Sequence, residues 1–392
     1  MDMKTRPTKS DIIAAVKKIG EEISVVHVND VDVNARFPIE TISALKEHLV
    51  LSAGVPEEFG GCGMTVTELG HLCRVLARYC SSSAMVMGMH FIKVQTIVHF
   101  SQEKSELQEY LMRIVREQRL VASVTSEEGI GGNMRTSIAA INKTGKRFQL
   151  VKKSSCLSYG AYADDLLITC RNTEESASSD QAVVIAIGDD FSVEQTGIWD
   201  SLGMRGTCSA PFIITVDAEN HRILHDDFAY VASRTMLPET HIIWANIWLG
   251  IALEAGSRAR KLLQSKARKA PGKLPMNATD LAKLEVHLDR FRDTIRCISE
   301  DYERAHASDD DDYLTSMRFS IKINALKINA SEMSAEICTK AMAICGFAGY
   351  LNNTPFTIGR LLRDSLSAAP MIGNGRLYEA NATHLMITKG EI

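Results

Sequence analysis

The spacing of apolar side chains divides the chain into three stretches. Over the first 119 residues the spacing is helical: Ile12, Val16, Ile19 and Ile23 lie three or four positions apart, which predicts an amphipathic helix beginning near Ser10. The serines at 81–83 are expected to separate two helices. Further helices are predicted after Pro38, from Thr65 to about Cys80, through Met85, Met87 and Met89, and from Ser105 to Gln118.

From Leu120 to about Leu224 the pattern changes to short runs rich in β-branched residues, with turn residues between them. Such a pattern predicts a β-barrel or sandwich of about 100 residues. The expected strands are Val121–Thr125, Ser137–Ile141, Arg147–Val151, Asp165–Cys170, Ala182–Ile187 and Phe212–Val216.

From Pro238 to the end the helical period returns. The acidic run Asp309–Asp312 lies between two of the expected helices and is interpreted as a solvated loop. The predicted fold class is therefore multi-domain α+β: an N-terminal α-helical domain at 1–119, a middle β-barrel or sandwich at 120–232, and a C-terminal four-helix bundle at 233–392. The four long helices expected are His241–Ala267, Thr279–His306, Leu314–Cys345 and Thr357–Ala369.

Composition narrows the function classes. With 392 residues, 45% hydrophobic and 23% charged, the chain is an ordinary globular protein of more than one sub-domain. A net charge of −4 argues against nucleic-acid binding. No apolar run reaches membrane-spanning length and no secretory signal is visible, so a cytoplasmic protein without membrane contact is expected. The nine cysteines form no C-x-x-C pair, which predicts reduced thiols and no metal site.

Two motifs resemble those of a known family. Near the C-terminus, GFAGY at 346–350 is followed by Arg363-Asp364 and then by Met371-Ile372-Gly373. Earlier, PEEFGGCG at 56–63 forms a glycine-dense turn. Both motifs, together with the helical, β, helical order, resemble the FAD-dependent acyl-CoA dehydrogenase family over essentially the whole chain.

This resemblance implies a set of FAD-binding residues. The segment at 123–133 is similar to the family's flavin loop, which places Thr125 against the flavin ring and Gly131, Gly132 and Asn133 near the phosphates. The segment at 153–164 resembles a second flavin contact, with Ser158 facing flavin N5. Arg268 matches an arginine that reaches the pyrophosphate of a neighbouring subunit. Gly346, Asn374 and Arg376 occupy further cofactor positions.

The catalytic base of the family is missing from its usual position. The resemblance places the glutamate that removes the substrate α-proton at Ile372, and isoleucine accepts no proton. Three displaced candidates remain open. Glu239 lies beside the slot that some members use on the first helix of the C-terminal domain, Glu379 lies seven residues past Ile372, and His241 is the third.

Two functions remain open on this evidence, with a non-catalytic family member as a less favoured third. The first is α,β-dehydrogenation of an acyl-CoA or other acyl thioester, with hydride transfer to FAD N5 and an electron-transfer flavoprotein as acceptor. The second is a flavin-dependent monooxygenase or N-hydroxylase that uses O₂ and a flavin reductase. Ile372, Ser155 in place of an aromatic residue, and Ala343 in place of glutamine fit the second. The resemblance also implies a homotetramer or dimer.

Overall fold

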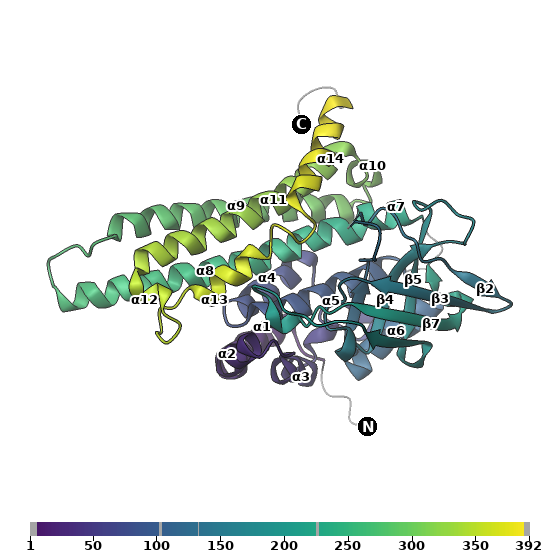
Figure 1. Cartoon of the computed structure of the whole chain (residues 1–392), viewed down its shortest axis with the longest axis horizontal. Helices are drawn as coiled ribbons and strands as arrows, with labels where there is room; N and C mark the ends of the chain where they lie inside the picture. The colour runs from purple at the N-terminus through teal and green to yellow at the C-terminus, as the bar shows by residue number, and fades with distance from the viewer. Residues whose placement is uncertain (1–5, 102–103, 132, 225–226, 388–392) are drawn as a thin grey trace.

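The computed structural model describes residues 6–101, 104–131, 133–224 and 227–387. A helical N-terminal part, two β-sheets and a long helical bundle follow one another along the chain (Figure 1). The α+β class expected from the sequence is confirmed, while the domain ranges 1–119, 120–232 and 233–392 stay a proposal. None of the described helices is both long and apolar enough to cross a membrane.

The N-terminal helices begin where the sequence signals place them. Thr65 and Glu68 form a reciprocal cap: Thr65 Oγ1 accepts from the Glu68 N–H, and Glu68 accepts from the Thr65 N–H at 2.8 Å. The Cys80 side chain caps the next helix by accepting from the Ser83 N–H. Ser81–Ser83 therefore form the first turn of that helix and are not the break between two helices. The helices are α1 (Lys9–Ile19), α2 (Val25–Val33), α3 (Ile39–Glu47), α4 (Val66–Ala77), α5 (Ser81–His99) and α6 (Ser105–Glu117), with a π-helical turn at Gly20–Ser24 joining the first two.

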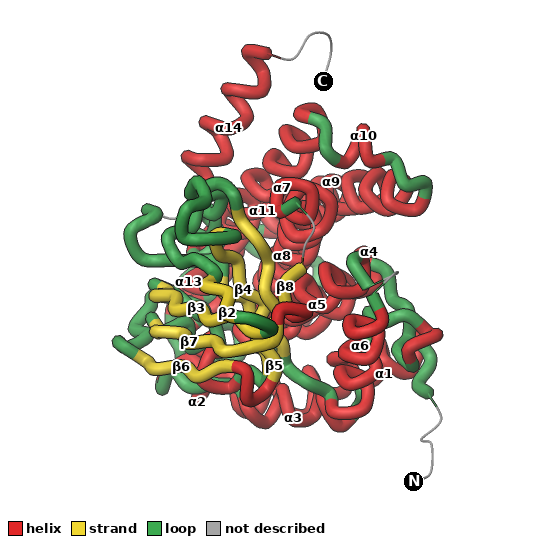
Figure 2. The backbone as a smooth tube through the Cα atoms, turned by 90° about the vertical axis from the view of Figure 1, so that its right-hand side faces the viewer, coloured by secondary structure: helices red, strands yellow, loops and turns green. Residues whose placement is uncertain are grey.

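The β region is a pair of four-stranded sheets (Figure 2). The first contains β1 (Val121–Val124), β4 (Asp165–Arg171), β5 (Gln181–Ile187) and β8 (Ile223–Leu224); β1 and β4 run parallel and the other pairs antiparallel. The second is antiparallel throughout and contains β2 (Asn142–Thr144), β3 (Arg147–Ser154), β7 (Phe212–Glu219) and β6 (Phe191–Gln195). In β3 alternate residues are buried, as expected when one face packs on the other sheet.

The strand predicted at Ser137–Ile141 is wrong. This segment is a loop that contributes one isolated bridge, Ala140 to Arg171. The Glu127 carboxylate accepts hydrogen bonds from the N–H groups of Ile138, at 3.0 Å, and Ala139, at 2.6 Å. Because a side chain occupies these donors, they are unavailable to a neighbouring strand. Strands β6 and β8 were not expected; β6 is short and mostly exposed.

The C-terminal part is a bundle of long helices. Its core contains large rings with no more than 1% of their surface exposed, among them Trp248, Phe291 and Tyr302. Helix α14, which was not expected, projects from the bundle (Figure 1). The helices are α8 (Leu237–Lys269), α9 (Ala278–Ala307), α11 (Met317–Cys345), α13 (Gly359–Leu366) and α14 (Asn374–Ile387), with short turns α7 (Phe228–Val231), α10 (Asp311–Leu314) and α12 (Phe347–Tyr350).

The acidic run between α9 and α11 is only partly a solvated loop. The side chain of Asp309 is 87% exposed, yet it pairs with buried Arg234 at 2.7 Å. Asp311 pairs with the same guanidinium. One buried cation therefore holds two of the four aspartates.

The Arg363-Asp364 pair joins the three parts of the fold. Arg363 forms an ion pair with Asp32 on α2 and donates to the carbonyl of Leu202 at 2.8 Å. The Asp364 carboxylate accepts from the Met204 N–H at 2.8 Å. A motif that is contiguous in sequence thus fixes the bundle against both the helical and the β parts.

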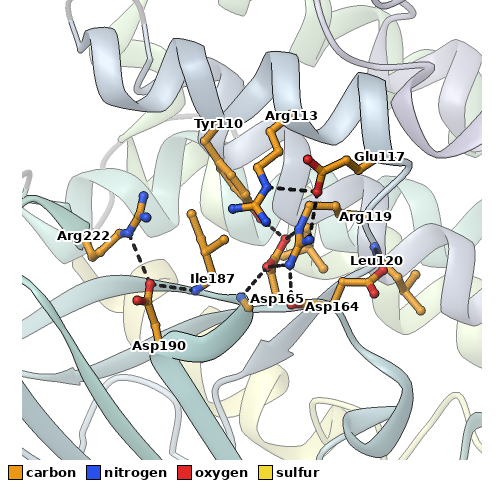
Figure 3. A network of polar contacts seen from close by, with 12 residues as sticks. Tyr110, Arg113, Glu117, Arg119, Leu120, Asp164, Asp165, Ile187, Asp190 and Arg222 are labelled. Carbon is orange, nitrogen blue, oxygen red and sulfur yellow. Dashed lines mark hydrogen bonds and ion pairs between the residues drawn. The ribbon is translucent and has the colours of Figure 1, made fainter.

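A second polar joint holds α6 against the first sheet (Figure 3). The Asp165 carboxylate, fully buried at the start of β4, accepts from the Tyr110 hydroxyl at 2.7 Å and from Arg119 at 2.6 Å through two nitrogens. The N–H of Gly188 donates to it at 3.0 Å. All the charge of this carboxylate is matched by groups on neighbouring elements, which favours a single docking geometry.

Replacing Asp165 by alanine removes the buried partner of the Arg119 guanidinium, whose side chain is only 12% exposed, and leaves it only the more exposed Glu117 carboxylate at 3.1 Å. We expect a loss of about 3–5 kcal/mol in the free energy of unfolding, measured by urea denaturation. Arg147→Ala is the matched control, because the ion pair of Arg147 with Asp217 is exposed to solvent and contributes little to stability. Equal losses in the two variants would contradict this role of Asp165.

Candidate flavin and substrate site

The loop that follows β1 is held by a buried ion pair. Glu127 accepts from the Ser137 hydroxyl at 2.6 Å and lies 3.4 Å from the Lys152 ammonium. Burial opposes its ionisation, but Ser137, Lys152 and backbone N–H groups together hold the pKa of Glu127 below its usual value. This buried ion pair anchors the loop to β3. Gly129 and Gly131, with φ of +87° and +57°, turn the exposed part of the loop through conformations that favour glycine.

A row of hydroxyl groups lies between the second predicted flavin segment and the turn before β7. The Ser158 and Ser209 hydroxyls are 2.8 Å apart, and Ser209 is 2.8 Å from the hydroxyl of Thr207. Thr207 in turn donates to the Met204 carbonyl at 2.8 Å. Because the Met204 carbonyl can only accept, the Thr207 hydroxyl must donate to it, and this fixes the donor direction at one end of the row. Thr125 is half-buried and directly follows β1.

The start of α14 meets the first loop. The Arg376 guanidinium donates to the carbonyl of Gly131, so two residues that are 245 positions apart and were both predicted to bind cofactor are brought together. Exposed Asn133 lies in the same loop. Gly132, the remaining predicted contact, lies outside the described residues. Arginine beside glycine N–H groups is the donor set that a phosphate requires, so this part of the chain fits the flavin phosphates.

The segment that carries Ile372 is fixed by one buried lysine. Lys327 of α11, with no exposed surface, donates to the carbonyl of Ile372 at 2.8 Å, to that of Ala369 at 3.3 Å, and to Asn374 Oδ1 at 2.7 Å. Ser331 also contacts the Asn374 side chain, at 3.0 Å. The Asn374 side chain is therefore already hydrogen-bonded within the protein.

Ile372 adopts an unusual backbone conformation. Its φ is +49°, a left-handed value that β-branched residues rarely take. Such a residue stores about 1–3 kcal/mol of strain, which persists only where surrounding contacts enforce it. The Lys327 bonds to the Ile372 and Ala369 carbonyls are those contacts. Strained positions of this kind cluster at functional sites, in agreement with the role proposed for this segment.

The two candidate carboxylates lie in different environments. Glu379 is exposed on α14. Glu239, 2% exposed near the start of α8, accepts from the Tyr302 hydroxyl at 3.0 Å through one oxygen, and its other oxygen has no partner among the described residues. Burial raises the pKa of Glu239 well above its usual value, although Tyr302 and buried Lys93 favour the charged form. The side chain thus faces α9 and α5.

Two predicted cofactor residues lie far from the others. Arg268 is exposed in the last turn of α8, and Gly346 begins the α12 turn with φ +60°. Figure 1 shows this end of the bundle pointing away from the sheets. Arg376 instead contacts Gly131, in the loop that follows β1. One chain therefore does not bring the two groups to a single flavin.

Several buried charged residues were not identified from the sequence, among them Lys327, Glu127 and Lys93. Lysine at a helix position flanked by apolar residues carries a detectable signal, because buried lysine is rare unless it is paired. Lys327, between Leu326 and Ile328, shows this pattern. Glu127 lies within the segment at 123–133, where Thr125, Gly131, Gly132 and Asn133 were interpreted but Glu127 was given no role.

The family can be assigned from comparison with known proteins. The model of the acyl-CoA dehydrogenase N-terminal domain matches residues 6–118, and that of the C-terminal domain matches residues 230–377. The chain is 20% identical over 341 residues to a short-chain specific acyl-CoA dehydrogenase of Clostridium acetobutylicum, covering 86% of each. It is 24% identical over 323 residues to a probable FMNH2-dependent monooxygenase, SfnC, of Pseudomonas putida, covering 77% of each.

The fold comparison agrees. The structure of dibenzothiophene monooxygenase (TdsC) from Paenibacillus sp. A11-2 superimposes with a TM-score of 0.80 at 16% identity, covering 97% of this chain and 98% of the other. The chain belongs to the acyl-CoA dehydrogenase family and is a flavin-dependent enzyme.

The lysine that holds the Ile372 segment gives a pH-dependent prediction. Burial lowers the pKa of Lys327 to about 8, whereas an unfolded chain keeps lysine near about 10.4. Between these values the unfolded state binds more protons, so the contribution of Lys327 to stability rises with pH. From pH 8 to pH 10 we expect the free energy of unfolding of the wild type to rise relative to that of Lys327→Met, measured by urea denaturation.

Lys153→Met, a change at an exposed lysine on β3, is the control. A difference between the wild type and Lys327→Met that stays constant over this pH interval would contradict the buried, partly neutralised state of Lys327.

Proposed function

We propose that this chain is a flavin-dependent monooxygenase on the acyl-CoA dehydrogenase fold, supplied with reduced flavin by a separate reductase. The observation that carries the proposal is Ile372: the strained position that presents the base in this family holds an aliphatic side chain. Monooxygenation with reduced flavin and O₂ requires no α-proton abstraction, so it tolerates this replacement.

The positions of the two carboxylates support the proposal. Glu379 is exposed on α14, a helix that begins at Asn374, and it lies seven residues past Ile372 in the chain. Glu239 is enclosed by Tyr302 and Lys93. The likeness to SfnC, a probable FMNH2-dependent monooxygenase, over 77% of both chains agrees with this proposal.

The second candidate is α,β-dehydrogenation of an acyl thioester, with an electron-transfer flavoprotein as acceptor. One observation favours it: a Glu239 carboxylate oxygen has no partner among the described residues and is free to accept a proton. A carboxyl group with a raised pKa is a suitable general base. The likeness to short-chain acyl-CoA dehydrogenase agrees with this candidate.

FAD, typical of the family, is the flavin we propose, and its binding residues come from two subunits. Thr125, Gly131, Asn133, Ser158, Asn374 and Arg376 would serve the flavin of their own chain. Arg268 and Gly346, at the far end of the bundle, would serve that of a neighbour. A shared site of this kind requires a closed homo-oligomer, a dimer or tetramer.

The flavin band reports directly on the choice between the two functions. Butyryl-CoA is added without oxygen to the oxidised, FAD-loaded protein, and absorbance near the flavin maximum is followed. We expect the wild type to keep its absorbance. Ile372→Glu restores a carboxylate at the strained position, where glutamate is better tolerated than β-branched isoleucine, and we expect this variant to bleach.

Bleaching by the variant also shows that the thioester enters the site. The lack of bleaching in the wild type is then due to the missing base and not to exclusion of the substrate. If the wild type bleaches, and Glu239→Gln lowers the rate at least about a hundredfold, the monooxygenase proposal fails and Glu239 is the base.

Subunit sharing is tested by mixing two weakened variants. Arg268→Met removes the proposed contact with a neighbour's flavin, and Arg376→Met removes the contact within the chain. Each alone is expected to bind FAD about tenfold more weakly, because one charge-assisted hydrogen bond is lost. In randomly mixed dimers about a quarter of the sites are intact, so that fraction should regain native affinity in a fluorescence titration.

The controls are preparations in which both subunits carry the same substitution. If the mixed sample binds FAD no better than these controls, the two arginines do not meet across a subunit interface.

A further inference from the structure

The row of hydroxyl groups that ends at Ser158 has a fixed direction of donation. Thr207 has one hydroxyl hydrogen, and it is directed at the Met204 carbonyl, 2.8 Å away. The contact of 2.8 Å between Thr207 and Ser209 must therefore use the hydrogen of Ser209. By the same reasoning, the contact of 2.8 Å between Ser209 and Ser158 must use the hydrogen of Ser158. The Ser158 hydroxyl thus directs its hydrogen into the protein.

A thiol also contacts Ser209, and it leaves this order unchanged. The Cys156 side chain is hydrogen-bonded to Ser209. A thiol is a weak acceptor and the Thr207 hydroxyl is a strong one, so Thr207 keeps the hydrogen of Ser209. The oxygen of Ser209 has two lone pairs, and these accept from the Ser158 hydroxyl and from the thiol.

Backbone hydrogen bonds hold Ser158 beside the row. On one side of it, the Leu157 N–H donates to the Ala210 carbonyl at 2.9 Å. On the other side, the Tyr159 N–H donates to the Thr207 carbonyl at 2.8 Å. The side chains of Leu157 and Tyr159 are fully buried, so the backbone that carries Ser158 is anchored at both of its neighbours.

Exposure rises along the row toward Ser158. Thr207 and Ser209 are 3% and 4% exposed, whereas Ser158 is half-buried. Within the part of the chain that the structure describes, the Ser158 hydroxyl has no hydrogen-bond partner besides Ser209. Ser158 therefore offers a ligand two unused lone pairs and no hydrogen.

Flavin N5 changes its hydrogen-bonding character on reduction. Oxidised flavin presents a lone pair at N5, whereas reduced flavin carries a hydrogen there. A hydroxyl that can only accept pairs with the reduced form and sets lone pair against lone pair in the oxidised form. Hydrogen bonds to the ring nitrogens are one means by which a protein tunes a flavin.

We propose that Thr207 and Ser209 are positioning residues, which orient the Ser158 hydroxyl as an acceptor so that the site selects reduced over oxidised flavin. This inference rests on the proposed function and on the expected place of Ser158 at flavin N5. The preference suits a monooxygenase supplied by a separate reductase, because the reduced flavin is retained and the oxidised flavin is released.

The test compares the affinity of the full chain for FAD in its two redox states. Oxidised FAD, and FAD reduced with dithionite in the absence of oxygen, are titrated calorimetrically into the protein. We expect the wild type to bind reduced FAD about tenfold more tightly, the effect of one hydrogen bond. For a two-electron couple, this ratio raises the midpoint potential of bound FAD by about 30 mV over that of free FAD.

Thr207→Val is the decisive variant, because it removes a hydroxyl that reaches Ser158 only through Ser209. The Ser209 hydrogen then turns to Ser158, and the Ser158 hydrogen turns to the flavin. We expect this variant to bind oxidised FAD at least as tightly as reduced FAD. Thr207→Ser restores the hydroxyl and is expected to restore the preference. Ser209→Ala, which removes the acceptor of the Ser158 hydrogen, is a second variant with the same expected loss.

Ser154→Ala is the matched control, because its buried hydroxyl belongs to a different row. That hydroxyl is 2.8 Å from the hydroxyl of Ser126, which donates to the Cys156 carbonyl at 2.6 Å. This second row ends on a carbonyl and does not reach the Ser158 hydroxyl, so we expect the control to keep the wild-type preference. Thermal unfolding of all variants verifies that they are folded.

A preference that survives in Thr207→Val and Ser209→Ala overturns the proposal. So does an equal loss in Ser154→Ala, or a wild type that binds oxidised FAD as tightly as reduced FAD. A chain that binds neither form overturns it together with the flavin site itself. The bleaching experiment fails separately: a wild type that bleaches with butyryl-CoA refutes the monooxygenase, whereas the affinity ratio reports on the row of hydroxyl groups.

Discussion

One buried ammonium group fixes the part of the chain on which the chemistry depends. Lys327 binds the carbonyls of Ala369 and Ile372 and the side chain of Asn374. A desolvated lysine is costly, and here burial depresses its pKa to about 8. The three acceptors offset part of that cost and, in return, the segment is held in a strained left-handed turn. We propose that the residue presented at that turn decides which reaction the site supports.

This arrangement separates the scaffold from the reaction. Three parts of the fold are joined by Arg363 and Asp364, and α6 is joined to the first sheet through Asp165. None of these contacts involves the side chain of Ile372. The base position is therefore free to change without loss of the fold, which is why membership of the family does not by itself define the reaction.

The sequence predicted the order of the parts because that order depends on local periodicity. The helical spacing of Ile12 and Val16 and the capping box at Thr65 depend on near neighbours, and the structure has helices at both places. The failures occurred where distant contacts decide. The segment at 137–141 is a loop because Glu127 takes its N–H groups, and helix α14 begins at Asn374, where Lys327 and Ser331 hold the side chain.

The candidate site shows the same difference between features set by local sequence and features set by distant contacts. Glycine positions and polar residues were located from motifs, and the contact between Arg376 and Gly131 places two of them together. The charged groups that organise the site, Lys327 and Glu127, have partners far away in sequence, so no local pattern revealed their roles. Likewise, the separation of Arg268 from the β region became visible only from the length of α8.

The central claim is that no carboxylate serves as base beside the flavin. A crystal structure of the FAD-loaded protein with a bound substrate analogue tests it most directly. The account predicts Ile372 facing the ring and no carboxylate oxygen within about 3 Å of the reacting carbon. Glu239 turned away from Tyr302 and directed at that carbon would contradict it.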